Sequence, residues 1–194
     1  MAWEKSFCIE EALERAAMVF WAKGYEGTTM SDLIKGMGIN KGSLYNAFGC
    51  KKELFKRVLT QFNVEHQRPN LRQLEGLDDP VLAITTLFDT AITQGVTDIE
   101  RKGCLIINTA LEIPNHDEDV GDIVRAVMAE LEQFFLRMVQ LGQARGEIST
   151  DLHPTHAAKS LVSLLVGIRV LSRGAFDAAG LLAVKSSALR LIKA

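Results

Sequence analysis

The chain of 194 residues is 47% hydrophobic and 24% charged, which is enough apolar material to bury a core without disulfides or metals. These values exclude a disordered or low-complexity chain, and a formal net charge of -2 gives no overall preference for nucleic acid. Three cysteines, odd in number and far apart, argue against a disulfide framework or a zinc site and favour a reducing compartment.

The sequence carries no recognisable export or membrane signal. The segment from Met1 to Glu14 is too charged for a signal peptide, and no apolar run reaches the roughly 18 residues that a membrane helix requires. We therefore expect a soluble, cytoplasmic protein without membrane association.

Apolar residues recur at helical spacing along almost the whole chain. The first stripe begins at Ile9, and Gly24 is expected to end that helix. No segment alternates apolar and polar residues as a half-buried strand would. The predicted fold class is all-α, with about nine helices.

Two short helices follow the first. Thr29, with Asp32 three residues later, forms a capping-box pattern that predicts the start of the second helix. Asn40 is a good N-cap for a third helix over Lys41–Phe48, in which Leu44 points inward. Two short helices joined by a glycine-containing turn on a helical core form a helix-turn-helix, which holds its second helix in a DNA major groove.

Positive charge is concentrated in this part of the chain. Between Lys35 and Arg68 there are seven Lys or Arg residues and two acidic residues. Such a surplus suits a phosphate-binding surface, although a short basic stretch alone is more often a solvated face.

The rest of the chain is also predicted to be helical. A fourth helix is expected to run to Pro69, and the stretch from Pro69 to Asp79 is predicted to join two parts of the protein. Further helices are predicted to begin at Pro80, to cover about Gly103 to Ile113 and Asp117 to Gly146, to begin at Pro154, and to cover Phe176 to Lys193. The chain thus divides into residues 1–68 and 69–194.

The first part resembles a known family. The segments Gly24-Tyr25, Thr28-Thr29-Met30, Gly38 through Phe48, and Lys51-Lys52-Glu53-Leu54-Phe55 closely resemble the DNA-binding domain of the tetracycline-repressor (TetR) family of bacterial transcription regulators, and the resemblance spans roughly Ile9 to Phe62. It implies that residues 1–68 bind a near-palindromic double-stranded operator, by default as a repressor. Residues 69–194 would then sense a small-molecule effector and form a homodimer.

Eight residues are candidates for DNA contact under this resemblance. They offer hydroxyl, amide or ammonium donors, or a backbone that can come close to the duplex: Thr28, Thr29, Lys41, Gly42, Ser43, Tyr45, Asn46 and Lys52. Lys41 and Ser43 are predicted to read bases, Lys41 by donating to a guanine edge, while Thr28, Thr29, Tyr45 and Lys52 hold phosphates. For Tyr45, a half-buried core position is the alternative.

Three positions depart from the family pattern. Asn46 stands where histidine is common, and its amide can still donate to a phosphate. Gly36 lies inside the second helix, where alanine is usual, and should weaken that helix by about 1 kcal/mol. Cys50 occupies a cap position usually held by Ser or Asp, so that cap is expected to be weaker.

The segment Gly103-Cys104-Leu105-Ile106 resembles one branch of the family, in which some members detect electrophiles or oxidants with this cysteine. Cys104 would need a depressed pKa for such chemistry, and Arg101 and Lys102 could supply positive charge nearby. A buried thiol that packs as a small hydrophobe is the favoured interpretation. Redox or electrophile sensing through Cys104 is kept as an alternative function.

The family's effector cavity lies in the C-terminal part, and simple core packing is an equally good interpretation of each candidate there. The candidates for ligand or redox sensing are Cys104, Asn108, Phe88, Phe134 and Met138. The helix that begins at Pro154 is apolar nearly all round and must be covered. With the helix over Phe176 to Lys193, it resembles the family's dimer element, a four-helix bundle between two subunits.

Other classes of function fit less well. The sequence contains no convincing set of residues at catalytic or metal-ligand spacing. Glu112 and His116 are four residues apart, but Pro114 interrupts the helix between them. No enzyme activity, metal or cofactor is therefore expected. A helical adaptor without DNA binding would explain the apolar stripes. It would not explain the basic region around the third helix.

Overall fold

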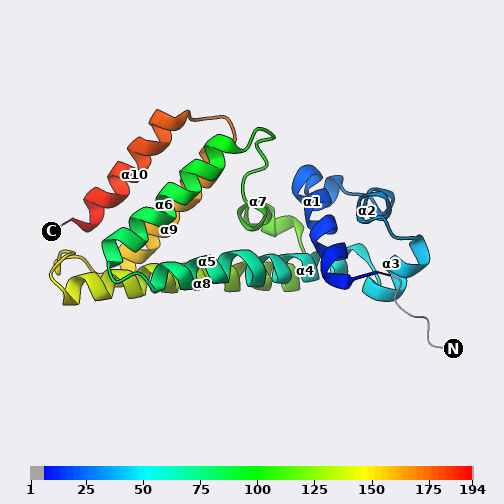
Figure 1. Ribbon diagram of the computed structural model, residues 1–194, viewed down its shortest axis with the longest axis horizontal. Coiled ribbons are helices and arrows are strands. Elements are labelled where there is room, and N and C mark those ends of the chain that lie inside the picture. The colour runs from blue at the N-terminus through cyan, green and yellow to red at the C-terminus, as the bar shows by residue number, and fades with distance from the viewer. Residues whose placement is uncertain (1–6, 194) are drawn as a thin grey trace.

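The computed structural model describes residues 7–193, which fold into α-helices with short connections and no strand (Figure 1). The all-α class is therefore confirmed. Residues 1–6 and 194, at the outer ends of the two predicted domains, lie outside the described residues. Within residues 7–193, no helix is both long and apolar enough to cross a membrane.

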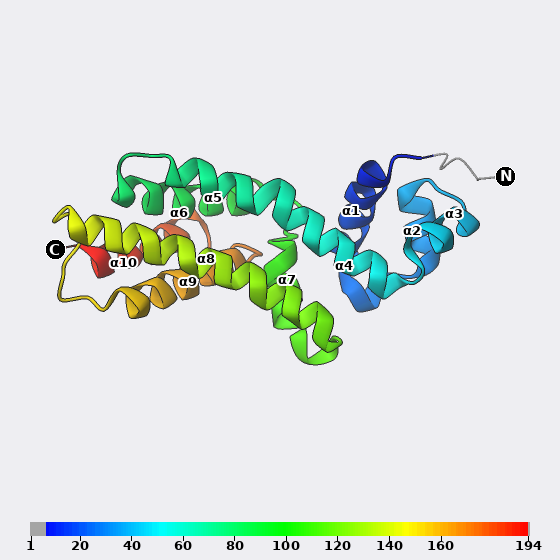
Figure 2. The same ribbon diagram turned by 90° about the horizontal axis from the view of Figure 1, so that it is seen from below.

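Four helices form a bundle at one end of the elongated molecule (Figures 1 and 2). They are α1 (Ile9–Gly27), α2 (Met30–Met37), α3 (Lys41–Phe48) and α4 (Lys51–Phe62). Their core combines aliphatic side chains with the buried rings of Phe20, Phe48 and Phe55, and the rings of Phe20 and Phe55 lie 4.7 Å apart between centroids. Gly24, with a φ of 70°, interrupts α1 as predicted, and one further turn continues to Gly27.

The helix that was expected to end at Pro69 continues beyond it. A π-helical turn, Asn63–Gln67, links α4 directly to α5 (Arg68–Glu75). At its end, the N–H of Arg68 donates to the carbonyl oxygen of Asn63, five residues back. Pro69 follows this π-helical turn, and the altered hydrogen-bond spacing there accommodates a residue without an N–H donor inside the continuous helix. With α4 and α5 counted as one continuous helix, the ten α-helical segments of residues 7–193 make nine.

Five helices complete the fold. They are α6 (Pro80–Thr97), α7 (Leu105–Leu111), α8 (Glu118–Ala144), α9 (Pro154–Leu171) and α10 (Ala178–Ile192). Pro80 and Pro154 open helices as predicted. The helix α7 is shorter than the predicted stretch because Gly103 has a φ of 70° and a separate 3-10 turn follows at Ile113–Asn115.

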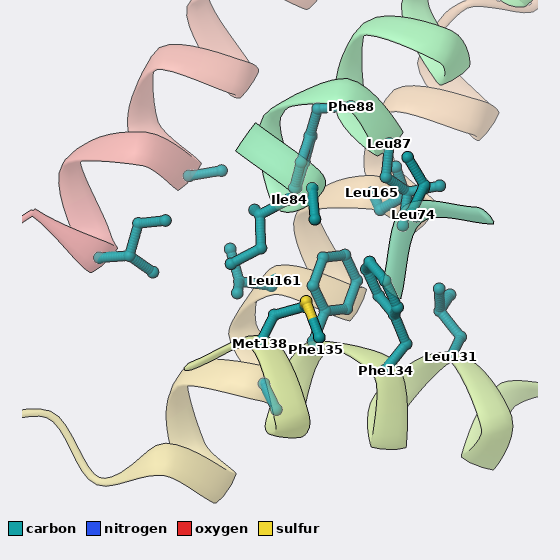
Figure 3. Packing of buried hydrophobic residues seen from close by; sticks show 14 of the residues in the cluster. Leu74, Ile84, Leu87, Phe88, Leu131, Phe134, Phe135, Met138, Leu161 and Leu165 are labelled. Carbon is teal, nitrogen blue, oxygen red and sulfur yellow. The ribbon is translucent and has the colours of Figure 1, made fainter. Parts of the chain in front are cut away.

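The buried apolar side chains form two clusters. The C-terminal cluster joins α5, α6, α9, α10 and the second half of α8, and includes Phe88, Phe134 and Met138 (Figure 3). The N-terminal cluster contains the core of α1–α4 together with Leu105 of α7 and Val124 of α8. Although α7 and the start of α8 come after the predicted boundary, they pack on the bundle that carries the helix-turn-helix.

Ion pairs and hydrogen bonds fasten the continuous helix α4–α5 to α8, which runs alongside it (Figure 2). Lys56 Nζ lies 2.7 Å from Asp119 Oδ2, and the guanidinium of Arg68 pairs with Glu130. Glu130 also accepts a hydrogen bond of 3.1 Å from the amide of Asn63 in the π-helical turn. The bundle is thus held to the second part of the chain along one line of polar contacts.

Candidate nucleic-acid interface

The start of α2 is fixed by a reciprocal cap. Thr29 Oγ1 accepts a hydrogen bond from the backbone N–H of Asp32 at 3.1 Å, and Asp32 Oδ2 accepts one from the N–H of Thr29 at 3.0 Å. This capping box was predicted and is confirmed. A hydrogen bond from Lys23 and those from Thr29 hold the pKa of Asp32 below its ordinary value of 3.8.

The orientation of α3 follows from its cap and its buried face. Asn40 Oδ1 accepts a hydrogen bond from the N–H of Ser43 at 2.8 Å, as predicted, and Leu44 and Phe48 are buried in the N-terminal cluster. Because Gly38 takes a φ of 68°, the chain turns sharply between α2 and α3. The two short helices are held at a fixed angle by these three features.

The opposite face of α3 is open to solvent. It carries Lys41, Gly42, Tyr45 and Asn46, all of which are exposed. The side chain of Tyr45 is 42% exposed and belongs to neither cluster of buried apolar residues. Lys41 Nζ lies 5.9 Å from the centroid of the Tyr45 ring. Four of the eight predicted contact residues therefore share one accessible surface.

Two predicted contact residues have little exposed surface. Thr28 is 1% exposed, and its hydroxyl donates to the carbonyl oxygen of Gly24 at 2.6 Å. Ser43 is 7% exposed because it lies on the same side of α3 as the buried Leu44. The hydroxyl of Thr28 is therefore not available to a duplex in this conformation, so the phosphate contact predicted for it does not fit the structure. The base contact predicted for Ser43 stays a prediction.

Lys52 forms ion pairs with carboxylates of the same chain. Its Nζ lies 3.0 Å from Asp117 Oδ2 and 3.8 Å from Asp119 Oδ2 at the start of α8. The hydrogen bond with Asp117 raises the pKa of Lys52. The ammonium would have to leave these carboxylates to reach a phosphate.

Lys51 supports the interface and was not identified from the sequence. Its Nζ donates to the carbonyl oxygens of Tyr25 at 3.0 Å and Thr28 at 3.1 Å, and lies 4.2 Å from the centroid of the Tyr25 ring. It therefore ties α4 to the turn between α1 and α2. The sequence does not show which of the two lysines contacts this turn, because that depends on which side of α4 packs against it.

The candidates for effector sensing lie in separate places. Phe88, Phe134 and Met138 meet in the C-terminal cluster, where each is at most 5% exposed (Figure 3). Cys104 packs against the N-terminal cluster instead and is half-buried. It is the N-cap residue of α7 and not an interior helical residue as expected.

Asn108 is held by neighbours on both sides. Its Nδ2 donates to the carbonyl oxygen of Lys102 at 2.7 Å, and its Oδ1 accepts from Arg173 Nη1 at 3.2 Å. The side chain is therefore fixed at the corner where α7 meets the chain after α9. It orients Arg173, a residue that was not singled out in the sequence.

Two family models match the chain. One, described as bacterial regulatory proteins of the tetR family, matches residues 12–58. The other, described as a tetracyclin repressor-like C-terminal domain, matches residues 80–181, which is more than half of the chain. The two matches fall on either side of the connection between α5 and α6.

Individual relatives cover nearly the whole chain. The HTH-type transcriptional repressor ComR of Escherichia coli (strain K12) is 27% identical over 96% of this chain and 90% of its own length. The HTH-type transcriptional regulator YezE of Bacillus subtilis (strain 168) is 32% identical over 78% and 80% respectively. A cysteine mutant of the TetR family regulator CifR, solved with double-stranded operator DNA, matches with a TM-score of 0.82 and 30% identity over 95% of this chain and 97% of that one. In sequence and in fold, this chain belongs to the tetR family of bacterial regulatory proteins.

Proposed function

We propose that this chain is a homodimeric, cytoplasmic transcriptional repressor that binds a near-palindromic operator and releases it when a small-molecule effector binds. The observation that carries the proposal is the exposed face of α3, with Lys41, Gly42, Tyr45 and Asn46 on a rigidly capped helix-turn-helix. Family membership supports it, because the relatives include named repressors and a complex with operator DNA.

The chemistry of these side chains suggests a division of roles. Tyr45, Asn46 and Thr29 offer hydroxyl and amide groups to phosphate oxygens, which positions the protein without reading sequence. Lys41 precedes them on the first turn of α3 and can donate to the N7 and O6 acceptors of guanine. Gly42 has no Cβ, and an added one would meet only Asn40 Oδ1 at 3.4 Å, so this part of α3 is open for close approach of the duplex.

The dimer is proposed to form through α9 and α10, the two helices predicted above to cover one another across a two-fold axis. They lie at the end of the molecule opposite α3 (Figure 1). In that arrangement, the two copies of α3 face outward and can enter successive major grooves of one duplex. Two-fold protein symmetry then requires a near-palindromic operator.

Selection of bound fragments from genomic DNA, followed by gel-shift titration of the enriched site, tests this function. We expect a near-palindromic site that binds two chains much more tightly than random DNA at the same salt concentration. Equal affinity for all sequences would contradict specific operator binding. Absence of any salt-dependent DNA binding would favour the helical adaptor.

Sensing through Cys104 is a second candidate function, supported by its half-buried thiol at the start of α7. Alkylation there would place a bulky group where α7 packs on α1 and α8. The test is operator release by electrophiles in the wild type and in Cys104→Ser. Release that disappears in the variant supports this mechanism, and release that is unchanged excludes it.

A further inference from the structure

A small polar cleft lies where the helix-turn-helix bundle meets α7, outside the C-terminal cluster. Its volume is about 220 Å³. Its lining includes Trp21 and Tyr25 at the end of α1, together with Asn108, Glu112 and Arg173. Sites for drug-sized ligands begin at about 300 Å³, so this cleft suits a ligand with a single ring.

Arg173 supplies a cation that no carboxylate neutralises. Its Nε donates to the carbonyl oxygen of Arg101 at 3.0 Å, and its Nη1 donates to Asn108 Oδ1 at 3.2 Å, so both partners are neutral oxygens. Within residues 7–193, Arg173 forms no ion pair. A guanidinium has five N–H donors, and the remaining ones are free to bind a planar anion such as a carboxylate.

Glu112 supplies an acceptor at a second point of the cleft. It follows Asn108 by four residues, about one helical turn from the position that holds Arg173. Its carboxylate lies against Gly24 of α1, where an added Cβ would be 3.9 Å from Glu112 Oε1. Its Oε2 is 3.8 Å from Nε2 of His116, a buried atom without a hydrogen-bond partner among the described residues.

We propose that this cleft binds a small aromatic acid whose carboxylate pairs with Arg173, whose ring packs against Trp21 and Tyr25, and whose opposite end donates a hydrogen bond to Glu112. The proposal rests on the proposed function, because it names the chemical class of the effector and its place. It puts the effector at the junction with the helix-turn-helix and not among Phe88, Phe134 and Met138.

The position of the cleft explains how such a ligand would act on DNA binding. The same junction is closed by the Trp21 indole N–H, which donates to the carbonyl oxygen of Gly103 at 3.1 Å. A ligand that fits best when α1 has moved away from α7 stabilises a conformation in which the two α3 helices of the dimer no longer match the operator. Only such a difference in affinity between conformations shifts the equilibrium.

The test uses the full chain, 4-hydroxybenzoate as the probe and 4-hydroxybenzamide as its neutral counterpart. Binding is measured by calorimetry, and operator release is measured by gel shift. We expect the acid to bind and release the operator and the amide to bind much more weakly. In Arg173→Gln, the affinity for the acid should fall at least about tenfold, whereas Arg72→Gln, which removes an exposed cation on α5, should leave it unchanged.

A second variant examines the other end of the site independently of Arg173. Glu112→Ala should weaken 4-hydroxybenzoate and leave unsubstituted benzoate unaffected, since only the former carries the donor. Failure of the acid to bind at millimolar concentration, or undiminished binding by Arg173→Gln, overturns the inference. Operator binding without additive is measured first: if it is absent, the proposed function fails, and if it is present, only the effector site is in question.

Discussion

Adjacent residues of the same type have different environments in this interface. Thr28 and Thr29 are both threonines after α1, yet the first is buried with its hydroxyl on Gly24 and the second is exposed at the cap of α2. Lys51 and Lys52 differ in the same way, one bound to backbone carbonyl oxygens and the other to Asp117. The chemical type of a residue therefore identifies a possible DNA contact, but its position on the helix decides whether it is available.

The buried hydroxyl of Thr28 should contribute to stability and not directly to DNA contact. Thr28→Val keeps the shape of the side chain but leaves the carbonyl oxygen of Gly24 without this donor. We expect a loss of about 1 kcal/mol in the free energy of unfolding. Thr28→Ser, which retains the hydroxyl, is the control in denaturant titration. Equal stability of the valine variant and the wild type would show that the hydrogen bond contributes nothing net.

The exposed face of α3 should separate affinity from specificity. Tyr45→Phe removes one hydroxyl and should weaken binding to all sequences alike, because phosphates are the same at every site. Lys41→Ala should cost about 1–3 kcal/mol at one base position and relax the preference there. Competition gel shifts with single-base operator variants distinguish the two effects. A uniform loss in Lys41→Ala would place Lys41 on the phosphate backbone instead.

At the scale of the helix, the features predicted best are those that depend on neighbours in the sequence. The caps at Thr29 and Asn40 were found because each bonds to a residue three positions later. The contact of Lys52 with Asp117 was not, because 65 residues separate them and only the packing of α4 on α8 brings them together. The prediction that the fourth helix ends at Pro69 was wrong, because a π-helical turn before this residue allows the helix to continue.

Gly36 in α2 has a packing explanation that the sequence does not show. A Cβ added at this position would lie 2.3 Å from Cγ2 of Val19 in α1, and a β-branched side chain in a helix has little rotamer freedom to move aside. Gly36→Ala should therefore fail to give the stabilisation of about 1 kcal/mol expected from helix propensity alone. In a Val19→Ala background the same change should stabilise. Thermal unfolding of the four proteins in this cycle measures the coupling directly.

On the scale of the whole molecule, carboxylates of α8 connect the DNA-binding bundle to the rest of the chain. The hydrogen bond from Arg68 holds the pKa of Glu130 below its ordinary value of 4.5, and the hydrogen bond from Lys56 lowers that of Asp119 from 3.8. A depressed pKa in the folded state gives stability that is present above the ordinary value and is lost as the pH falls through the folded value. The ion pairs that hold α4 and α5 to α8 should therefore weaken as the pH falls.

This pH dependence can be measured with one variant. Unfolding free energy should decrease as the pH falls below about 4.5, and Glu130→Gln should show a smaller decrease because one of the linked protons has been removed. Glu147→Gln, which changes an exposed carboxylate after α8, is the control and should follow the wild type. If the two variants have the same slope with pH, the pair with Arg68 does not contribute to the linkage.

The proposed dimer can be tested with two leucines of equal exposure. Leu182 on α10 is 50% exposed, and Leu82 on α6 is 49% exposed, so each should tolerate a charge about equally in the isolated chain. If α10 packs on a second copy, Leu182→Glu places a carboxylate in an apolar interface and should convert the dimer to monomer at micromolar concentration. Operator affinity should fall with it, because each monomer then holds only one half-site. Light scattering measures the molar mass of both variants. If Leu182→Glu remains a dimer, or if Leu82→Glu becomes a monomer to the same extent, the interface lies elsewhere.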